Sequence, residues 1–173
     1  MKRMGFATPL ILAVAVGCAL ACGMPPLEQE APAETPPSDK DLQKQTVADL
    51  RNTGTAMFAW LTDQVGAAAA GQSQVPQSVD FAEYAAISHA DLSTILVPAY
   101  MTEVPELDGW KSPYEYYVNV ANPLAERILG IRSTGRDGKF SSDVYTVTSF
   151  DPSSFDEDLV WADGFFVRWP QKQ

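Results

Sequence analysis

The first regular pattern of apolar positions in the chain predicts a long amphipathic helix. Between residues 47 and 65, apolar residues and one glycine recur at steps of three and four, which places them on one face of a helix. They are Val47, Leu50, Gly54, Met57, Phe58, Leu61 and Val65. Ser38 follows two prolines and stands three residues before Asp41, a pattern typical of a helix N-cap with an acidic first turn. We therefore expect a helix from Ser38 to about Ala70, whose apolar face packs on the protein's own sheet.

After Pro113 the pattern changes to short runs of β-branched and aromatic residues, which predict strands. Such runs occupy residues 115–120, 128–133 and 144–148, and a final pair occupies 159–161 and 165–169. The final pair is joined through Asp163-Gly164, a favoured hairpin turn. Residues 81–104, which contain Pro98, predict only short helical turns. The order of elements predicts an α+β domain, in which the long helix packs across an antiparallel sheet of three or four strands.

The N-terminal segment predicts export. A basic start at residues 1–3 precedes an uncharged, mostly apolar run at 4–21 that ends in small residues, which is the layout of a secretory signal. Both cysteines of the chain lie at its end, so no disulfide is expected in the folded part. The stretch at residues 19–23 resembles a bacterial lipobox, which implies cleavage before Cys22 and a lipid on its side chain. Cys18 is the alternative lipidated residue, and an ordinary signal with unmodified cysteines is a second alternative.

These signals divide the chain into a signal peptide (1–21), a lipidated Cys22 with a Pro-, Glu- and Ala-rich linker (22–37), and one domain (38–173). Hydrophobic residues make up 46% and charged residues 20% of the chain, which is typical of a folded domain. The 12 Lys and Arg residues are outnumbered by 22 Asp and Glu, and loss of Lys2 and Arg3 with the signal increases the acidic excess. A protein that binds nucleic-acid phosphates needs the opposite sign, so we expect no nucleic-acid partner.

Several passages resemble the major pseudopilin of type II secretion systems. VADLRNTGTAMFAWLTDQ (47–64) is similar to the end of that family's long N-terminal helix, and LVPAYMTEVPELDGWKSPYEY (96–116) is similar to the passage that follows it. The second passage carries the resemblance through Asp108, Trp110, Pro113, Tyr114 and Tyr116. GIRSTGRDGKFSSD (130–143) and DEDLVWADG (156–164) look like the family's calcium-loop region and closing strand. The resemblance covers about residues 47–170 and implies a pilin-like domain with a structural role.

The N-terminus departs from the pseudopilin pattern. A filament subunit of that family carries a glutamate close to the cleavage site and a continuous apolar helix. Here no acidic residue precedes Glu28, and prolines at 9, 25 and 26 interrupt the helix. Lys111 also stands where the family usually has a glycine. These departures favour a pilin-type soluble domain carried on a lipid anchor.

The acidic residues of the predicted loops favour a binding site for a hard cation such as calcium. Calcium takes six to eight oxygen ligands from carboxylates, carbonyls and water. Asp137 precedes a glycine that permits a sharp turn, and further carboxylates follow at loop distance and in the next segment. The candidate ligands for a structural calcium ion are Asp137, Asp143, Asp156 and Asp158. An ordinary Asp-Gly turn is the alternative, because Arg136 and Lys139 weaken the acidic field.

The remaining residues favour a protein without enzymatic activity. His89 is the only histidine, which is too little for a histidine-based triad. Aromatic residues of the predicted sheet region are expected to fill the core, with sugar stacking as the alternative. They are Trp110, Tyr114, Tyr116, Trp161, Phe165, Phe166 and Trp169.

We therefore expect a lipid-anchored structural or interaction protein of the bacterial cell envelope. It would face the periplasm or the cell surface and act beside a type II secretion or pilus-like system. One alternative is a true pseudopilin held in the membrane by a helix at residues 6–21. Another is an envelope protein that binds a peptide or a glycan on its sheet.

Overall fold

A single long helix, α1 (Asp39–Val65), begins where the sequence pattern predicts it. The computed structural model describes residues 36–66 and 76–172. The Ser38 side chain accepts the backbone N–H of Asp41 at 3.3 Å and donates to its carboxylate at 2.6 Å, so the predicted N-cap is confirmed. The helix ends before Gly66, which has a positive φ of 63° and whose N–H bonds to the Thr62 carbonyl. The predicted continuation to Ala70 lies outside the described residues.

The predicted apolar face of α1 is the face that packs on the sheet. Leu50, Met57 and Leu61 are buried, and Gly54 lies against the ring of Trp161. The remaining three positions of the apolar pattern are partly buried at the sides of this contact. The opposite face is exposed, as at Asn52. Hydrophobic burial along one stripe therefore holds the helix in place.

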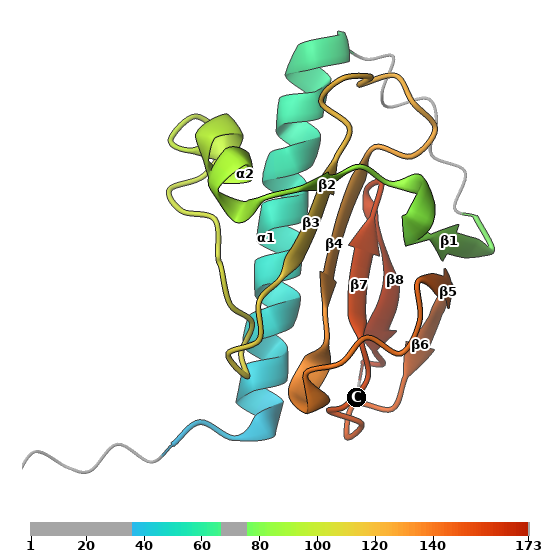
Figure 1. The fold of residues 1–173 in the computed structure, drawn as a ribbon. Helices are drawn as coiled ribbons and strands as arrows, with labels where there is room; N and C mark the ends of the chain where they lie inside the picture. Colours follow the sequence, from blue (N-terminus) through green and yellow to red (C-terminus); the bar gives the residue numbers. More distant parts are fainter. Residues whose placement is uncertain (1–35, 67–75, 173) are drawn as a thin grey trace, which may run out of the picture. The chain divides into compact units, whose positions relative to one another are not determined.

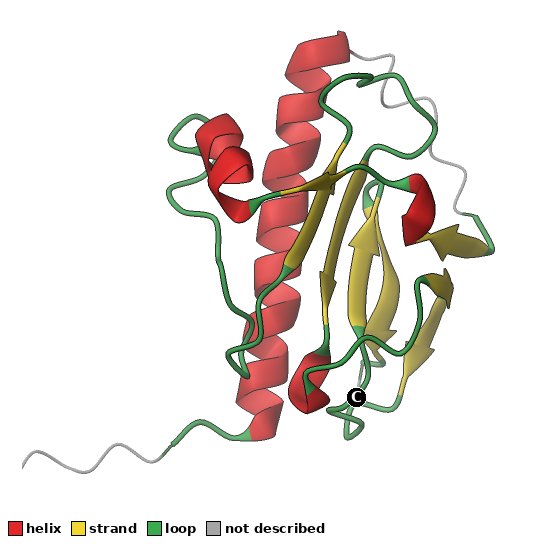
Figure 2. Ribbon diagram, viewed as in Figure 1, coloured by secondary structure: helices red, strands yellow, loops and turns green. Residues whose placement is uncertain are grey.

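The sheet has six strands in the order β2–β3–β4–β7–β8–β6 (Figure 1). Its strands are β2 (Ala86–Ile87), β3 (Glu115–Val118), β4 (Leu129–Ser133), β6 (Thr148–Phe150), β7 (Leu159–Ala162) and β8 (Phe165–Pro170). All pairs are antiparallel except β6 and β8, which are parallel. The helix α1 lies along one face, over β4 and β7 (Figure 2). The α+β class and the packing of the helix on the sheet are thus confirmed.

The prediction of three or four strands was wrong. The central run β3–β4–β7–β8 corresponds to four of the predicted strands, but β2 and β6 add one short strand at each edge. The predicted strand at 144–148 is also divided, because β5 (Val144–Thr146) leaves the main sheet and pairs with β1 (Ser78–Asp80). Elements of two or three residues are too short to show a period in the sequence.

Two hydrophobic clusters lie on the two faces of the sheet. The larger one fills the space between α1, α2 (His89–Leu96) and the sheet, and includes the buried side chains of Leu92, Leu96 and Ile131. The smaller one packs residues of the short 3₁₀ helix η2 (Phe81–Glu83) and of β1 and β5 against the other face. The two short helices agree with the helical turns predicted for residues 81–104.

The closing hairpin has the turn that the sequence predicts. Asp163 and Gly164 join β7 to β8, with φ angles of 45° and 102°. Aspartate tolerates a positive φ better than most residues, and glycine adopts it freely. The Asp-Gly hairpin is therefore confirmed.

No helix within the described residues is long and apolar enough to cross a membrane. The predicted signal peptide, Cys18 and Cys22 lie outside the described residues.

The contact of Gly54 with Trp161 leads to a prediction about stability. A Cβ atom added at Gly54 would lie 2.5 Å from the Trp161 ring, which is buried and cannot easily move. Although alanine is normally better than glycine in a helix by about 1 kcal/mol, overpacking costs about 1–3 kcal/mol. We expect Gly54→Ala to lower the free energy of unfolding in denaturant titrations.

Asn52→Ala, on the exposed face of the same helix, is the matched control. It should leave stability unchanged or raise it by a few tenths of a kcal/mol, because only helix propensity changes. A Gly54→Ala variant that is more stable than the wild type would contradict this account of the helix–sheet contact.

Candidate functional site

The predicted calcium ligands lie in two loops that pack against each other. One loop follows β4 and contains the 3₁₀ helix η3 (Gly135–Asp137), and the other precedes β7. Gly135 has a positive φ of 67°, and a Cβ atom there would lie 2.7 Å from the carbonyl oxygen of Glu157. The backbone N–H of Arg136 also donates to the Phe155 carbonyl at 2.8 Å. The two loops are therefore in direct backbone contact.

Two of the four predicted ligands are paired with arginine. Asp156 accepts two hydrogen bonds from the Arg136 guanidinium, at 2.8 and 2.9 Å, and this pairing holds the pKa of its carboxyl below the ordinary value. Asp143 accepts one from Arg132 at 2.8 Å. Arginine therefore already neutralises both carboxylates.

The other two predicted ligands, Asp137 and Asp158, have no arginine partner. Asp137 is exposed and accepts the N–H of Lys139 at 3.0 Å. Asp158 is only 1% exposed, and its Oδ2 accepts from the Ser141 N–H at 2.9 Å, the Ser141 hydroxyl at 2.6 Å and the Tyr145 hydroxyl at 2.9 Å. Its Oδ1 is buried without a hydrogen-bond partner. Burial raises the pKa of the Asp158 carboxyl, and the nearby charge of Asp137 adds to the rise.

The structure thus divides the predicted ligands into two arginine pairs and one pair of neighbouring aspartates. Within residues 36–66 and 76–172, no three Asp, Glu, His or Cys side chains are grouped so that they could hold a metal ion. Any cation beside Asp158 and Asp137 would need its further ligands from backbone carbonyls, hydroxyls and water.

Two further carboxylates organise loops in the same way as Asp158. Asp108 is fully buried; its Oδ1 accepts the N–H groups of Trp110 and Ser112, each at 2.9 Å, and its Oδ2 accepts the Ser133 hydroxyl at 2.7 Å. This aspartate joins the loop before β3 to the end of β4.

Asp163, in the hairpin turn, is the third such carboxylate. Its Oδ1 accepts the N–H groups of Ile128 and Leu129 at 3.1 and 2.9 Å, and its Oδ2 accepts the Tyr84 hydroxyl at 2.6 Å. Burial raises the pKa of the Asp163 carboxyl, although the hydrogen bonds that it accepts oppose the rise. The sequence indicated only a turn at this position, because its partners are distant in the chain.

The first half of α1 is attached to the loop that contains Asp108. Trp110 donates its indole N–H to Asp39 at 3.0 Å, and the backbone N–H of Gly109 donates to the Thr46 hydroxyl at 3.0 Å. The approach is close, because a Cβ atom at Gly109 would lie 2.4 Å from the carbonyl oxygen of Leu42. The loop that contains Asp108 and Trp110 therefore contacts α1 near its N-terminal end.

His89 has a structural partner. Its Nε2 donates to the carbonyl oxygen of Val104 at 2.9 Å, which joins the start of α2 to the loop that follows the helix.

Aromatic residues predicted to fill the core do so only in part. Tyr114, Tyr116 and Trp161 are buried in the larger hydrophobic cluster, whereas Phe166 packs at its edge and remains partly exposed. Trp110, Phe165 and Trp169 are also partly exposed.

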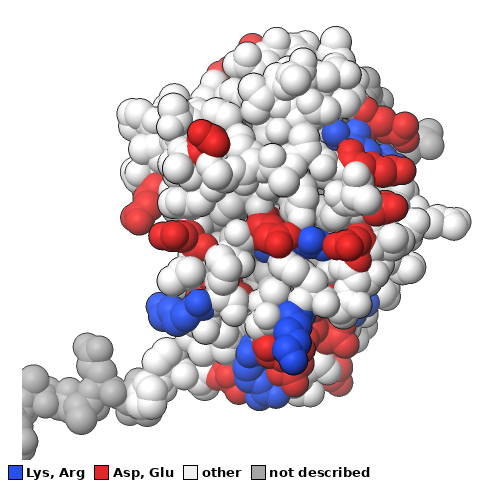
Figure 3. All heavy atoms as spheres, in the orientation of Figure 1, with Lys and Arg blue, Asp and Glu red and all other residues white. Residues whose placement is uncertain are grey.

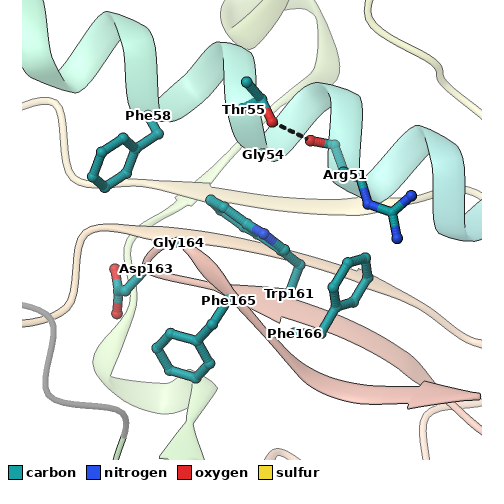
Figure 4. Close-up of a pocket in the computed structure, with 9 residues that line it drawn as sticks. All are labelled: Arg51, Gly54, Thr55, Phe58, Trp161, Asp163, Gly164, Phe165 and Phe166. Atoms are coloured by element: carbon teal, nitrogen blue, oxygen red, sulfur yellow. Dashed lines mark hydrogen bonds between the residues drawn. The ribbon is translucent and has the colours of Figure 1, made fainter. Parts of the chain in front are cut away.

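An apolar groove lies where these residues meet α1 (Figure 4). Its volume is about 550 Å³. The lining residues come from α1, β7 and the start of β8, and they are Arg51, Gly54, Thr55, Phe58, Trp161, Asp163, Gly164, Phe165 and Phe166. Figure 4 shows Phe58 and Phe166 on either side of Trp161, with Arg51 near Phe166. The sequence identified the aromatic residues but could not show that α1 leaves a groove beside them.

Charged residues are interspersed on the face drawn in Figure 3, and the end of that face nearest the C-terminal end of α1 carries few of them. Many of the basic groups are paired, as in the contacts of Arg132 with Glu115 at 2.7 Å and of Arg127 with Glu83 at 3.4 Å. On this face, charges of both signs are therefore interspersed, and several of them form ion pairs.

Comparison with known proteins finds no family model that matches the chain, no similar curated protein and no similar solved structure.

The raised pKa of Asp163 predicts how stability depends on pH. Because its folded pKa lies above the ordinary value of 3.8, the folded state binds this proton more tightly than the unfolded state does. The resulting stabilisation is present below pH 3.8 and is lost as the pH rises through the folded pKa. We expect the melting temperature of the wild type, relative to Asp163→Asn, to rise as the pH falls from 7 to 4. The change is roughly 3 °C for each kcal/mol in a domain of this size.

Asp151→Asn provides a control of opposite sign. Hydrogen bonds from Ser153 lower the pKa of the exposed Asp151, so its contribution is present above pH 3.8 and is lost as the pH falls. Melting curves of Asp163→Asn that run parallel to those of the wild type over this range would exclude the raised pKa.

Proposed function

We propose that the chain is an exported, lipid-anchored protein of the bacterial cell envelope, and that its folded domain is a structural or interaction module. In this proposal Cys22 carries the lipid, residues 23–37 form a spacer, and the domain is similar to the soluble domain of a type II secretion pseudopilin. Its partners would be other components of a secretion or pilus-like assembly.

The observation that carries the proposal is the attachment of α1 to the loop at residues 105–114. The residues on which the pseudopilin resemblance rests make contacts within the fold, since Asp108 organises the loop and Trp110 binds Asp39 in the first turn of α1. Arg136 also reaches Asp39 at 3.1 Å. Two loops therefore hold the helix at the end that follows the linker, where a membrane tether would act on the domain.

The polar groups that an enzyme would use in catalysis have internal partners here, which favours a structural role. His89 donates to the Val104 carbonyl, and Asp108 and Asp163 accept backbone N–H groups. Hydrogen bonds of this kind order loops rather than activate a nucleophile.

A structural calcium ion is a second part of the proposal. It rests on the pseudopilin-like loop and on the unpartnered Oδ1 of Asp158, because a buried carboxylate oxygen without a hydrogen bond is costly and a cation would satisfy it. Asp137 is the neighbouring carboxylate without an arginine partner. The ion would fix the loop after β4 against the segment before β7.

The anchor is tested by replacing Cys22. We expect Cys22→Ala to abolish metabolic labelling with a clickable fatty acid and to release the protein from the membrane fraction, because the lipid is the proposed tether. Cys18→Ala is the matched control and should remain labelled. If labelling is lost only in Cys18→Ala, the lipidated residue is Cys18 instead of Cys22. Membrane association that survives both changes would favour a retained N-terminal helix.

Calcium binding is tested by thermal unfolding. A ligand that binds only the native state at about 100 times its Kd adds roughly 2.7 kcal/mol, so calcium should raise the melting temperature relative to chelator. Magnesium at the same concentration should not, because it dehydrates reluctantly and requires a tighter octahedron. Asp137→Asn should remove the rise, whereas Asp151→Asn, an exposed change in a neighbouring loop, should retain it. If the wild type has the same melting temperature in calcium and in chelator, the loop is an ordinary Asp-Gly turn and does not bind calcium.

A further inference from the structure

The groove beside α1 has an aromatic floor because the helix covers only part of the sheet. Helix α1 lies over β4 and β7, and β8 is the next strand outward. Trp161 on β7 therefore lies under Gly54, whereas its cross-strand neighbour Phe166 lies beyond the helix. Phe58, one turn along α1 from Gly54, completes the aromatic surface, and both phenylalanines remain partly exposed (Figure 4).

Arg51 is the one charged side chain of the groove that has no polar partner among the described residues. Among the other polar lining residues, Thr55 donates its hydroxyl to the Arg51 carbonyl at 2.8 Å, and Asp163 accepts from Tyr84 and two backbone N–H groups. The Arg51 guanidinium forms no ion pair with any described residue. Its carbon lies 5.7 Å from the centre of the Phe166 ring, which places the charge beside the apolar surface.

This arrangement differs from that of the other arginines in the described part of the chain. Each of those four forms at least one ion pair with an acidic side chain; they are Arg127, Arg132, Arg136 and Arg168. In a chain with a net charge of −10, acidic partners are abundant, yet Arg51 has none. The charge at this end of the groove is therefore complementary to a carboxylate supplied from outside.

We propose that the groove binds a short extended peptide segment of a partner protein, with a bulky apolar side chain near Phe58 and Trp161 and a carboxylate against Arg51. Arg51 and Phe58 are seven positions apart, which is a rise of about 10 Å along the helix, and an extended peptide covers this distance with about three residues. The apolar residue would thus stand two positions before or after the acidic residue, because alternate side chains of an extended peptide point to the same face. This inference concerns the folded domain and is independent of how the chain is anchored.

The test uses the purified full chain in a mild non-ionic detergent. The probe is the fluorescein-labelled peptide Ser-Leu-Phe-Glu-Gly, and its matched control is Ser-Leu-Phe-Gln-Gly; binding is followed by fluorescence polarisation, with detergent alone as the blank. We expect the Glu peptide to bind about tenfold more tightly than the Gln peptide, because the neutral Gln amide can still accept a hydrogen bond from Arg51 but lacks the charge of the carboxylate. High salt should reduce this difference.

Three protein variants locate the binding site. Arg51→Gln should bind the two peptides equally, and Phe58→Ala should weaken both, while thermal melts close to that of the wild type show that each variant is folded. Lys44→Gln removes the same charge from an exposed position of the same helix, outside the groove, and should bind as the wild type does.

Equal affinity of the wild type for the two peptides, or a loss of discrimination in Lys44→Gln as large as in Arg51→Gln, would overturn the proposal. So would a dimer in sedimentation experiments that Phe58→Ala dissociates, because the occupant of the groove would then be a second copy of the chain.

Discussion

The close approach of α1 to the sheet at Gly54 is the contact on which the rest of the structure depends. A glycine at this position lets the helix lie directly on the ring of Trp161, which in turn sets the height of α1 above β4 and β7. At that height, Leu50, Met57 and Leu61 are buried on either side of the glycine. Because α1 lies over β4 and β7, it does not cover the side of β8 that faces the helix layer. The groove is therefore a direct result of how the helix packs on the sheet.

Two buried carboxylates and one half-buried carboxylate hold the loops in a domain whose sequence after Cys22 contains no cysteine. Asp108, Asp158 and Asp163 each accept three hydrogen bonds, and in every case the donors include a group that is distant in the sequence. A buried carboxylate is costly unless it is satisfied, so each one requires a particular loop conformation. Specific polar contacts therefore order these loops without any disulfide in this part of the chain.

The sequence was sufficient for features that repeat over many residues or that depend on neighbouring residues. Four of the seven predicted apolar positions are buried in α1 and the other three are partly buried, Ser38 marked the start of the helix, and Asp163-Gly164 marked the hairpin turn. The sequence did not predict contacts between short segments that are distant in the chain. β2 and β6 contain only two and three residues, and β6 pairs in parallel with β8. The four predicted ligands were likewise chosen from their order in the chain, which does not show that Arg132 and Arg136 neutralise two of them.

The groove was the feature least accessible to sequence reasoning. Arg51 and Phe58 belong to a helix, and Trp161 and Phe166 to a hairpin that follows about 100 residues later. From the sequence, the arginine was expected to be exposed and the aromatic residues were expected to lie in the core. Only the position of the helix relative to β8 brings the unpaired guanidinium and the partly exposed rings together.

The contact between Gly54 and Trp161 also determines when the domain can complete its fold during synthesis. A chain that emerges from its N-terminus presents α1 long before β4 and β7, so Leu50, Met57 and Leu61 have no sheet to cover them at that stage. The parallel pairing of β6 with β8 requires residues 168–170 as well. Closure of such distant contacts makes folding slower than that of a helical bundle of the same size. The apolar stripe of α1 is therefore the surface that a holding chaperone would meet first.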